Sequence, residues 1–504
     1  MTPPMKNDLV ILDEPSIEFK YGQRLVQPQD GLTLFGPYDA NYSSQPPNMT
    51  YGLIGTEKGL KRFHSWSEIV MGGRATISNS NDNLWPLFPG FEAAMQCRWP
   101  IKPAHEIAVD EGIVVYHAHL NDPHLRTASV VSDYITELEK FALRDEEFGF
   151  VICIIPDEVW RYCRPKSRVE DGIGHRPTKK ELSDRRLGQL SILENDWSPE
   201  IYQFSEDFRR QMKARSLKYE IPIQIIREST LSLSDKDDET RRRLTPLSDR
   251  AWNLSTALYY KAGGKPWRLA SAREGVCYIG ISFKKTDAGE ESKTACCAAQ
   301  MFLDSGDGIM FLGDKGPWYA PSDRQFHLSR DAARALLSGV LKTYSDLEGK
   351  ELREIFLHSR SEIAPEEFEG YKEACPSGVK LVGIRVRPER NIRLMRKGRF
   401  PVARGTYWQI SDREAYLWTT GYKWKLRTFD GFGTPIPLRI NLMYGDADIA
   451  QISRDIFGLT KLDYNACKIG IANPVTIQFS DSVGEILISN PLVKNRNPKF
   501  KFYI

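Results

Sequence analysis

Residues 199–226 decide the fold class, and they read PEIYQFSEDFRRQMKARSLKYEIPIQII. Apolar residues recur at helical spacing through 199–219, which predicts one amphipathic helix. The apolar run that follows at 221–226 predicts a buried strand. An earlier run, GFVICIIP at 149–156, has the continuous apolar character of a strand covered on both faces of a parallel sheet. Because helix and strand alternate here, the sequence predicts an α/β fold.

The second half of the chain shows a similar alternation. Strands are predicted at 276–285, 294–303, 353–359 and 379–386, and helices at 329–345, 365–374, 446–458 and 478–489. Strands come first and then alternate with helices, so we expect a mixed sheet flanked by helices. Between the halves, the polar and charged stretch 232–250 predicts a surface connector. The stretch 251–269 predicts an apolar helix that ends at Gly263 and Gly264.

Length and composition limit the class of protein. A chain of 504 residues is too long for one ordinary core, so we expect two domains. Hydrophobic residues make up 41% and charged residues 27%, which excludes a disordered chain, a collagen and a membrane bundle. Lysine and arginine total 69 against 66 for aspartate and glutamate, so only the distribution of charge can indicate a nucleic-acid partner.

The sequence shows neither a membrane span nor an export signal. Its eight cysteines form no C-x-x-C pair and no zinc-type cluster. Reduced thiols are the simplest interpretation, and we expect a cytoplasmic protein with no membrane partner. We interpret Cys296 and Cys297 as small buried residues of a strand; a cysteine nucleophile with His327 or His358 is the alternative.

Four polar residues are spaced as members of one site. Arg209 and Lys213 are four positions apart and project from one face of the predicted helix. Gln224 lies on the strand that follows, where its amide can donate a hydrogen bond to a phosphate oxygen. Lys261 lies in the last turn of the next helix. Each cation also has a purely structural explanation, as part of a solvated helix face or as a charge at a helix C-terminus.

In this order the four residues resemble the pocket in which Argonaute proteins hold the 5′ phosphate of a guide strand. The family pattern is an aromatic or basic residue, a lysine four positions later, a glutamine on the next strand and a lysine before a Gly-Gly turn. Arg209 stands where many relatives have tyrosine or histidine, and a guanidinium can also stack or chelate. A terminal phosphate carries nearly two negative charges, which cations and an amide bind through charge-assisted hydrogen bonds.

Further phrases resemble the same family and together extend over most of the chain. They are DGLTLFGP (30–37), GLIGTEKGLKRF (52–63), LYYKAGGKPWRL (258–269), GISFKK (280–285), CCAAQMF (296–302) and LTKLDYNACKIGIANPVTIQFSDSVGEIL (459–487). The resemblance implies a Rossmann-like MID domain over 1–235 and an RNase H-like PIWI domain over 236–504. It also implies that the C-terminal carboxylate of Ile504 returns to the pocket and helps hold Mg²⁺ there. A buried apolar terminus is the alternative.

The resemblance further implies an inactive PIWI domain. Nucleases of this fold hold two Mg²⁺ ions with carboxylates. The first family aspartate corresponds to Ser282, and the second falls at Ser359 and Arg360, where a hydroxyl cannot bridge metals and an arginine repels them. Asp481 matches the fourth position, but one carboxylate cannot organise two metals. We therefore expect no catalytic residues in this chain; an active guide-dependent nuclease is the alternative.

The segment 385–405 carries eight basic residues and one acid, Glu389, and Pro and Gly interrupt it, so we expect a strand and an exposed hairpin. Its cations suit contacts with duplex phosphates, and docking of an acidic partner is the alternative. The eight are Arg385, Arg387, Arg390, Arg393, Arg396, Lys397, Arg399 and Arg404. Lys494, Arg496, Lys499 and Lys501 in the tail extend the expected positive channel, and Lys423, Lys425 and Arg427 are expected on a strand.

The sequence leaves no room for the N and PAZ domains of full-length Argonautes, so the chain resembles the short prokaryotic Argonautes. That resemblance implies a guide RNA with a 5′ phosphate, a single-stranded DNA target, and antiviral and anti-plasmid defence. It also implies a heterodimer with an effector chain, in which a PAZ-analogue domain is fused to a TIR or sirtuin-like domain that depletes NAD, or to a nuclease. The expected function is a guide-programmed sensor whose target pairing activates the effector. A guide-independent nucleic-acid-binding protein is the alternative.

Overall fold

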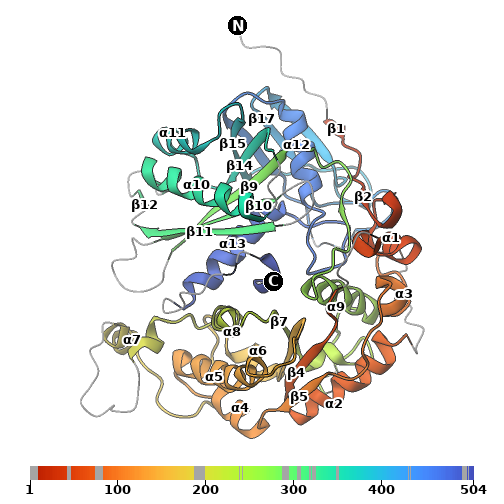
Figure 1. The fold of residues 1–504 in the computed structure, drawn as a ribbon, viewed down its shortest axis with the longest axis vertical. Coiled ribbons are helices and arrows are strands. Elements are labelled where there is room, and N and C mark those ends of the chain that lie inside the picture. Colours follow the sequence, from red (N-terminus) through yellow and green to blue (C-terminus); the bar gives the residue numbers. More distant parts are fainter. Residues whose placement is uncertain are drawn as a thin grey trace.

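Two layered parts build the molecule, and the C-terminus lies between them (Figure 1). The computed structural model describes all residues except 1–8, 42–46, 74–82, 187–198, 238, 241, 286–294, 303–307, 317–318, 321–324, 348–350, 430, 432, 491–496 and 498. One part is built on a four-stranded sheet and the other on a nine-stranded sheet. The α/β class predicted from the sequence is therefore confirmed. None of the helices in these described ranges is long and apolar enough to cross a membrane.

The four-stranded sheet has the order β5-β4-β6-β7, and every pair in it is parallel. Every residue of β4 and β6 is buried, as a sheet covered on both faces requires. Its strands are β4 (Tyr51–Gly55), β5 (His105–Ala108), β6 (Phe150–Ile155) and β7 (Ile223–Arg227). The helices around it are α2 (Glu57–Trp66), α3 (Phe91–Met95), α4 (Glu111–Ala118), α5 (Pro123–Ala142), α6 (Asp157–Tyr162), α7 (Lys179–Arg186) and α8 (Phe208–Ser216).

The nine-stranded sheet is mixed, with the order β1-β16-β17-β18-β15-β14-β9-β10-β11. Strand β14 pairs in parallel with β9 and β15, and the other pairs are antiparallel. The strands are β1 (Leu9–Ile11), β9 (Val276–Lys285), β10 (Ala295–Phe302), β11 (Gly308–Gly316), β14 (Glu354–Ser359), β15 (Lys380–Pro388), β16 (Thr406–Ser411), β17 (Glu414–Leu417) and β18 (Leu438–Tyr444). The predicted mixed sheet is confirmed. The side chains of Cys296 and Cys297 lie outside the described residues.

Helices cover both faces of the large sheet. Alternate residues of β9 face opposite sides, so that Ile279 packs in one core with Leu336 of α10 while Tyr278 packs in another with Val483 of α13. On the first face lie α10 (Arg330–Leu347) and α11 (Pro365–Ala374). On the second lie α12 (Ile449–Leu459) and α13 (Val475–Ile488), which contact β17 and β9. The four helices predicted in this half are confirmed.

The N-terminal segment belongs to the large sheet. Strand β1 forms its edge, with Leu9 opposite Trp408, and all three residues of β1 are exposed. The carboxylate of Glu14 then pairs with Arg404 at 3.0 Å and Lys461 at 3.1 Å in a buried ion triad. Short strands follow, β2 (Ile17–Glu18), β3 (Arg24–Leu25) and β8 (Arg268–Leu269), in the order β3-β2-β8, and helix α1 (Pro28–Phe35) leads on to β4.

The segment 199–219 is not one helix, as the sequence predicted. It forms a 3-10 turn at Pro199–Gln203, helix α8, and a second 3-10 turn at Leu217–Tyr219. Asp207 starts α8 because its side chain accepts a hydrogen bond from the backbone N–H of Arg210 at 3.0 Å. An internal capping residue outweighs the apolar periodicity that favoured a continuous helix.

The stretch 232–250 is not simply a surface connector either. Helix α9 (Leu247–Lys261) begins inside it and ends before Gly263, whose φ of +102° closes the helix as predicted. Arg250 is 7% exposed, and its guanidinium donates to the carbonyl oxygens of Thr230 (2.5 Å), Ser232 (2.8 Å) and Ser234 (2.6 Å). These bonds fold the connector back on α9.

Candidate functional site

Two buried lysine ammonium groups meet at one oxygen. Lys213 lies in the last turn of α8 and Lys261 in the last turn of α9. Both donate hydrogen bonds to the main-chain oxygen of Ile504, and Lys213 also donates to the carbonyl oxygen of Ile223 in β7 at 2.5 Å. The two lysines are 2% and 0% exposed. The fold thus brings α8, α9, β7 and the C-terminus together between its two parts (Figure 1).

Burial lowers the pKa of both lysines. For Lys213 desolvation acts first, and the positive charges of Lys261 and Arg209 lower its pKa further. The pKa of Lys261 falls to about 7, through desolvation and then through the charge of Arg209. The positive charge of Lys501 also lowers the pKa of Lys261. Like charges held in a desolvated space destabilise one another, so an anion placed among them is strongly favoured.

Arg209 is the exposed member of this cation cluster, which we define as Arg209, Lys213, Lys261 and Lys501. The Arg209 residue is exposed, yet desolvation by the surrounding protein lowers the pKa of its guanidinium. The sequence therefore identified Arg209, Lys213 and Lys261, and the two lysines share the oxygen of Ile504. The charge of Lys501 lowers the pKa of Lys261, which supports the predicted return of Lys501 to this site.

Gln224 lies beside the cluster. It follows Ile223, whose carbonyl oxygen accepts from Lys213, and it is half-buried. Its side-chain amide donates to the carbonyl oxygen of Ile225 at 3.2 Å, not to a member of the cluster. Gln224 is therefore adjacent to the cluster, and its role toward a phosphate stays a prediction.

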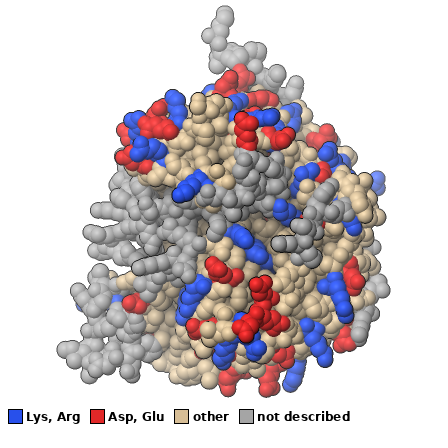
Figure 2. Space-filling view, in the orientation of Figure 1, with Lys and Arg blue, Asp and Glu red and all other residues tan. Residues whose placement is uncertain are grey.

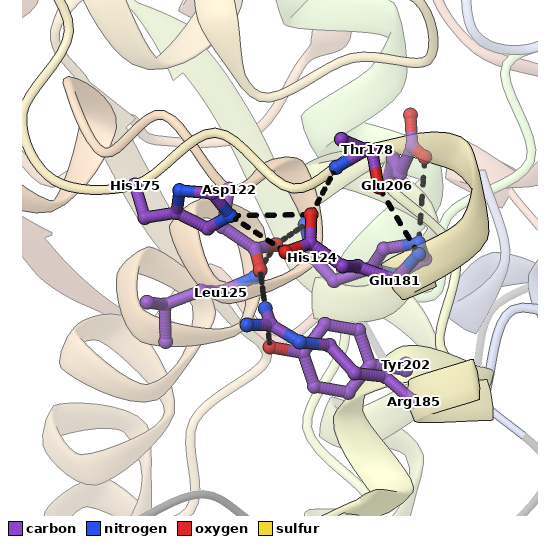
Figure 3. A network of polar contacts seen from close by, with 9 residues as sticks. All are labelled: Asp122, His124, Leu125, His175, Thr178, Glu181, Arg185, Tyr202 and Glu206. Atoms are coloured by element: carbon purple, nitrogen blue, oxygen red, sulfur yellow. Dashed lines mark hydrogen bonds and ion pairs between the residues drawn. The ribbon is translucent and has the colours of Figure 1, made fainter. Parts of the chain in front are cut away.

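The chain segment before α8 is fixed by a polar network on α5 (Figure 3). Asp122 caps α5, because its side chain accepts a hydrogen bond of 3.0 Å from the backbone N–H of His124. The same carboxylate accepts hydrogen bonds from Arg185 at 2.8 Å and from the Tyr202 hydroxyl at 3.0 Å. The 2% exposed ring of His124 contacts the carbonyl oxygen of Phe204 at 3.0 Å and the Glu206 carboxylate at 3.4 Å. This network positions α8, and sequence reasoning missed it because its members come from separate segments.

A second charged cluster surrounds Asp481, which the sequence resemblance assigned to the fourth position of the catalytic tetrad. Asp481 lies between two cations, with Arg360 at 2.7 Å and Lys284 at 3.3 Å. Lys284 also contacts Glu485 at 3.2 Å, and Glu485 contacts Arg210 of α8 at 2.8 Å. Nearby in β9, Ser282 is 6% exposed, and its hydroxyl has no hydrogen-bond partner. Among the described residues, no group of three or more histidine, cysteine or carboxylate side chains is placed to hold a metal ion.

The surroundings of Ile504 do not by themselves fit Mg²⁺. The oxygen expected to ligate the metal already accepts hydrogen bonds from two lysines, so a metal ion would have to displace both donors. Magnesium also requires several oxygen ligands in octahedral geometry. Ile504 as a metal ligand therefore stays a prediction. Ile504 itself is buried, as the alternative interpretation expected.

The basic segment 385–405 is a strand followed by turns, not a hairpin. Its first two arginines contact acids, Arg385 with Glu362 at 3.2 Å and Arg387 with Glu389 at 3.9 Å. Arg404 is 4% exposed in the ion triad with Glu14, so its predicted place on the basic surface is wrong. The remaining five are exposed and form what we call the basic loop: Arg390, Arg393, Arg396, Lys397 and Arg399.

Other basic residues differ from expectation. Lys423, Lys425 and Arg427 lie in a tight turn instead of a strand, with Arg427 at φ +50°. Lys494 and Arg496 lie outside the described residues. Basic and acidic side chains are intermingled over the face shown in Figure 2, in keeping with a net charge of only +3. Local clusters, and not an overall positive field, therefore have to carry any nucleic-acid binding.

No protein-family model and no curated protein matches this sequence. Solved structures do match. The chain is 17% identical to Clostridium butyricum Argonaute bound to a guide DNA and a 19-mer target DNA, with a TM-score of 0.64 over 99% of this chain and 55% of that one. The chain is 14% identical to Drosophila Piwi, with a TM-score of 0.57 over 98% of this chain and 56% of that one. It is also 14% identical to Aa-Ago with externally bound siRNA, with a TM-score of 0.57 over 99% of this chain and 56% of that one.

These comparisons establish the fold. The chain has the fold of the MID and PIWI parts of Argonaute proteins, as the sequence resemblance predicted, and it spans about half the length of the chains it matches. The boundary predicted between residues 235 and 236 stays a prediction.

Proposed function

We propose that this chain binds a guide strand by its 5′ phosphate and uses it to recognise a target strand. The observation that carries this proposal is the oxygen of Ile504 that Lys213 and Lys261 share, with the exposed Arg209 close enough for its charge to act on both. A buried cluster of cations suits the end of a strand better than its interior. A terminal phosphate brings up to two negative charges, whereas an internal phosphodiester brings one and continues in both directions.

Recognition of the target follows from anchoring. A guide held at one end presents its next bases in an ordered arrangement, so the guide loses less conformational entropy when it pairs with a target. Base pairing then reads sequence while protein cations contact the backbone. The exposed basic loop is the proposed contact for duplex phosphates, with docking of an acidic partner as the alternative. Similarity to an Argonaute bound to guide and target DNA supports nucleic-acid partners. RNA as guide and single-stranded DNA as target rest on the sequence resemblance.

We further propose that the chain itself does not cut. Asp481 is neutralised by Arg360 and Lys284, so the one retained carboxylate of the family's tetrad is committed to protein cations. The function is then that of a sensor in a prokaryotic defence complex. An effector with a PAZ-analogue domain and a TIR, sirtuin-like or nuclease domain is the proposed partner, on the sequence resemblance alone.

The first test is direct binding of short RNAs that differ only at the 5′ end. The purified chain should prefer a 5′ phosphate over a 5′ hydroxyl, and nucleic acid that copurifies should carry 5′ phosphates and a narrow length range. Lys213→Met with Lys261→Met should remove the preference, whereas Lys218→Ala, an exposed cation just past α8, should keep it. Equal affinity for both ends would favour a guide-independent nucleic-acid-binding protein. Metal-dependent cutting of a paired target would favour an active nuclease.

A further inference from the structure

The buried ring of His124 has an acceptor at each of its two nitrogen atoms. The side chain lies in the first turn of α5 and is 2% exposed. Its Nδ1 atom lies 3.0 Å from the carbonyl oxygen of Phe204, and its Nε2 atom lies 3.4 Å from the carboxylate of Glu206 (Figure 3). A carbonyl oxygen only accepts hydrogen bonds, so Nδ1 carries the hydrogen of that contact. The state of the Nε2 atom therefore decides the charge of the ring.

The contact between Nε2 and Glu206 is favourable only with a proton on one of the two groups. Without that proton, the lone pair of Nε2 faces a carboxylate oxygen, and two acceptors that face each other in a largely buried space are destabilising. With the proton, the pair is an imidazolium next to a carboxylate, or a neutral ring next to a protonated carboxyl group. Both forms are neutral as a pair, which lowers the cost of burying them. The geometry therefore favours one proton shared by His124 and Glu206.

Two further charges near His124 bear on this proton. Asp122 is neutralised by Arg185 at 2.8 Å. Arg126 favours loss of the proton, because its positive charge interacts with the carboxylate of Glu206, but its guanidinium is directed at three backbone carbonyl oxygens. His124 is thus the basic group that faces Glu206 directly. The titratable and charged groups around the pair in the described residues are Asp122 and Arg126 at the start of α5, Cys163 after α6, Arg176, the ion pair of His175 and Glu181, Arg185 of α7, Tyr202 and Asp207.

Glu206 lies directly before the start of α8. Its backbone carbonyl accepts from the Thr127 hydroxyl at 3.0 Å, and the next residue, Asp207, caps the helix. Arg209 of the cation cluster follows in the first turn. We infer that the proton shared by His124 and Glu206 positions the first turn of α8, so that loss of this proton loosens the helix start and weakens binding of a 5′ phosphate. The effect on the phosphate rests on the proposed function, whereas the effect on the helix does not.

The first experiment observes the proton on the free protein, by nitrogen NMR of the histidine rings over a pH series. Nε2 of His124 should be protonated at about pH 5.5, below the ordinary histidine pKa of about 6.5, and should lose its proton as the pH rises. In Glu206→Gln the loss should occur at lower pH, because a neutral amide can donate to the lone pair of Nε2. The matched control is Glu200→Gln, an exposed carboxylate in the 3-10 turn Pro199–Gln203, which should titrate like the natural protein. An Nε2 atom without a proton at about pH 5.5 overturns the inference.

The second experiment observes the start of α8, by hydrogen exchange of the backbone amides of Arg210 and Gln211, which donate to Asp207. After correction for the pH dependence of chemical exchange, their protection should fall about three- to tenfold as His124 loses its proton in the natural protein. In Glu206→Gln the protection should stay level, since the glutamine amide bonds to the neutral ring. The preference for 5′-phosphorylated over 5′-hydroxyl RNA should differ between the two proteins in the same way, because the contribution of Lys261 is common to both.

The outcomes separate the inference from the proposed function. Level protection in the natural protein, or an equal fall in Glu206→Gln, overturns the inference and leaves the proposed function standing. A phosphate preference that does not follow the protection overturns the link to the phosphate. A natural protein without any preference overturns the proposed function, while the NMR and exchange results still decide the positioning of α8. If Glu206→Gln fails to fold, the ring and the amides of the natural protein must still change at one common pH, and two different midpoints overturn the inference.

Discussion

Lys213 and Lys261, which are 48 positions apart in sequence, donate hydrogen bonds to the same oxygen of Ile504. Each ends a different helix, so neither the sequence spacing nor one helix face joins them. Their convergence is produced by the packing of α8, α9 and the C-terminus. The predictions below begin from this shared oxygen and move outward to the surface.

Removal of one ammonium group should weaken recognition of the guide's 5′ end. Lys213→Met keeps the apolar length of the side chain and deletes a donor to the phosphate, which costs about 1.5–3 kcal/mol, or roughly ten- to hundredfold in affinity. The measurement is the ratio of the affinities for 5′-phosphorylated and 5′-hydroxyl RNA, in the natural protein and in Lys213→Met. Unchanged preference in a folded Lys213→Met protein would contradict the proposed site.

Affinity for a 5′ phosphate should fall as the pH rises through about 7. The pKa of Lys261 is about 7 in the free chain, so the charge that attracts the phosphate is lost above that pH. The phosphate stays doubly charged there, because its second pKa is near 6. Titration of affinity between pH 6.5 and 9 should therefore slope downward in the natural protein. The slope should be shallower in Lys261→Met.

The same lysine should make the free protein more stable toward alkaline pH. Its pKa is lower in the folded chain than the ordinary 10.5, so between about 7 and 10.5 the unfolded state binds more protons. Stability rises with pH wherever the unfolded state binds more protons. Unfolding midpoints at pH 7 and 9 should thus increase more in the natural protein than in Lys261→Met. An equal change in both would place the pKa of Lys261 outside this window.

Substitution of Asp481 should lower the stability of the protein. Neither the natural protein nor the variant should cut a paired target. Asp481→Ala leaves Arg360 and Lys284 without their shared carboxylate, at a cost of about 1–2 kcal/mol in the free energy of unfolding. Denaturant unfolding measures this cost, and a paired, labelled target measures cutting. Metal-dependent cutting that Asp481→Ala abolishes would show that the chain is a nuclease.

The buried ion triad should hold the N-terminal segment in place at neutral pH. Burial raises the pKa of Glu14, but Arg404 and Lys461 outweigh it and hold the pKa below the ordinary value. The triad's stability is thus present above about pH 4.5 and is lost as the pH falls through the lowered pKa. Glu14→Gln leaves two buried cations unpaired and should cost about 3–5 kcal/mol in the free energy of unfolding. An unfolding midpoint equal to that of the natural protein would contradict this role.

Several features could be predicted from sequence because they are local. The strand predicted at 276–285 and the Gly263 stop behind Lys261 appear in the structure as β9 and the end of α9. Arg404 could not be placed, because its partner Glu14 lies 390 positions away and no local pattern distinguishes a buried arginine from an exposed one. Arg360 was recognised only as a residue unsuited to metal, since its ion pair with Asp481 depends on the packing of α13 against β14.

Strand β1 has a consequence for how the protein is made. Val10 pairs with Tyr407, so β1 finds its partner strand only after about 400 further residues have been synthesised. At about 5–20 residues per second, that interval is on the order of 20–80 s. During it the apolar residues Leu9, Val10 and Ile11 have no sheet to join, and a nascent chain that stalls before β16 leaves them open to other strands.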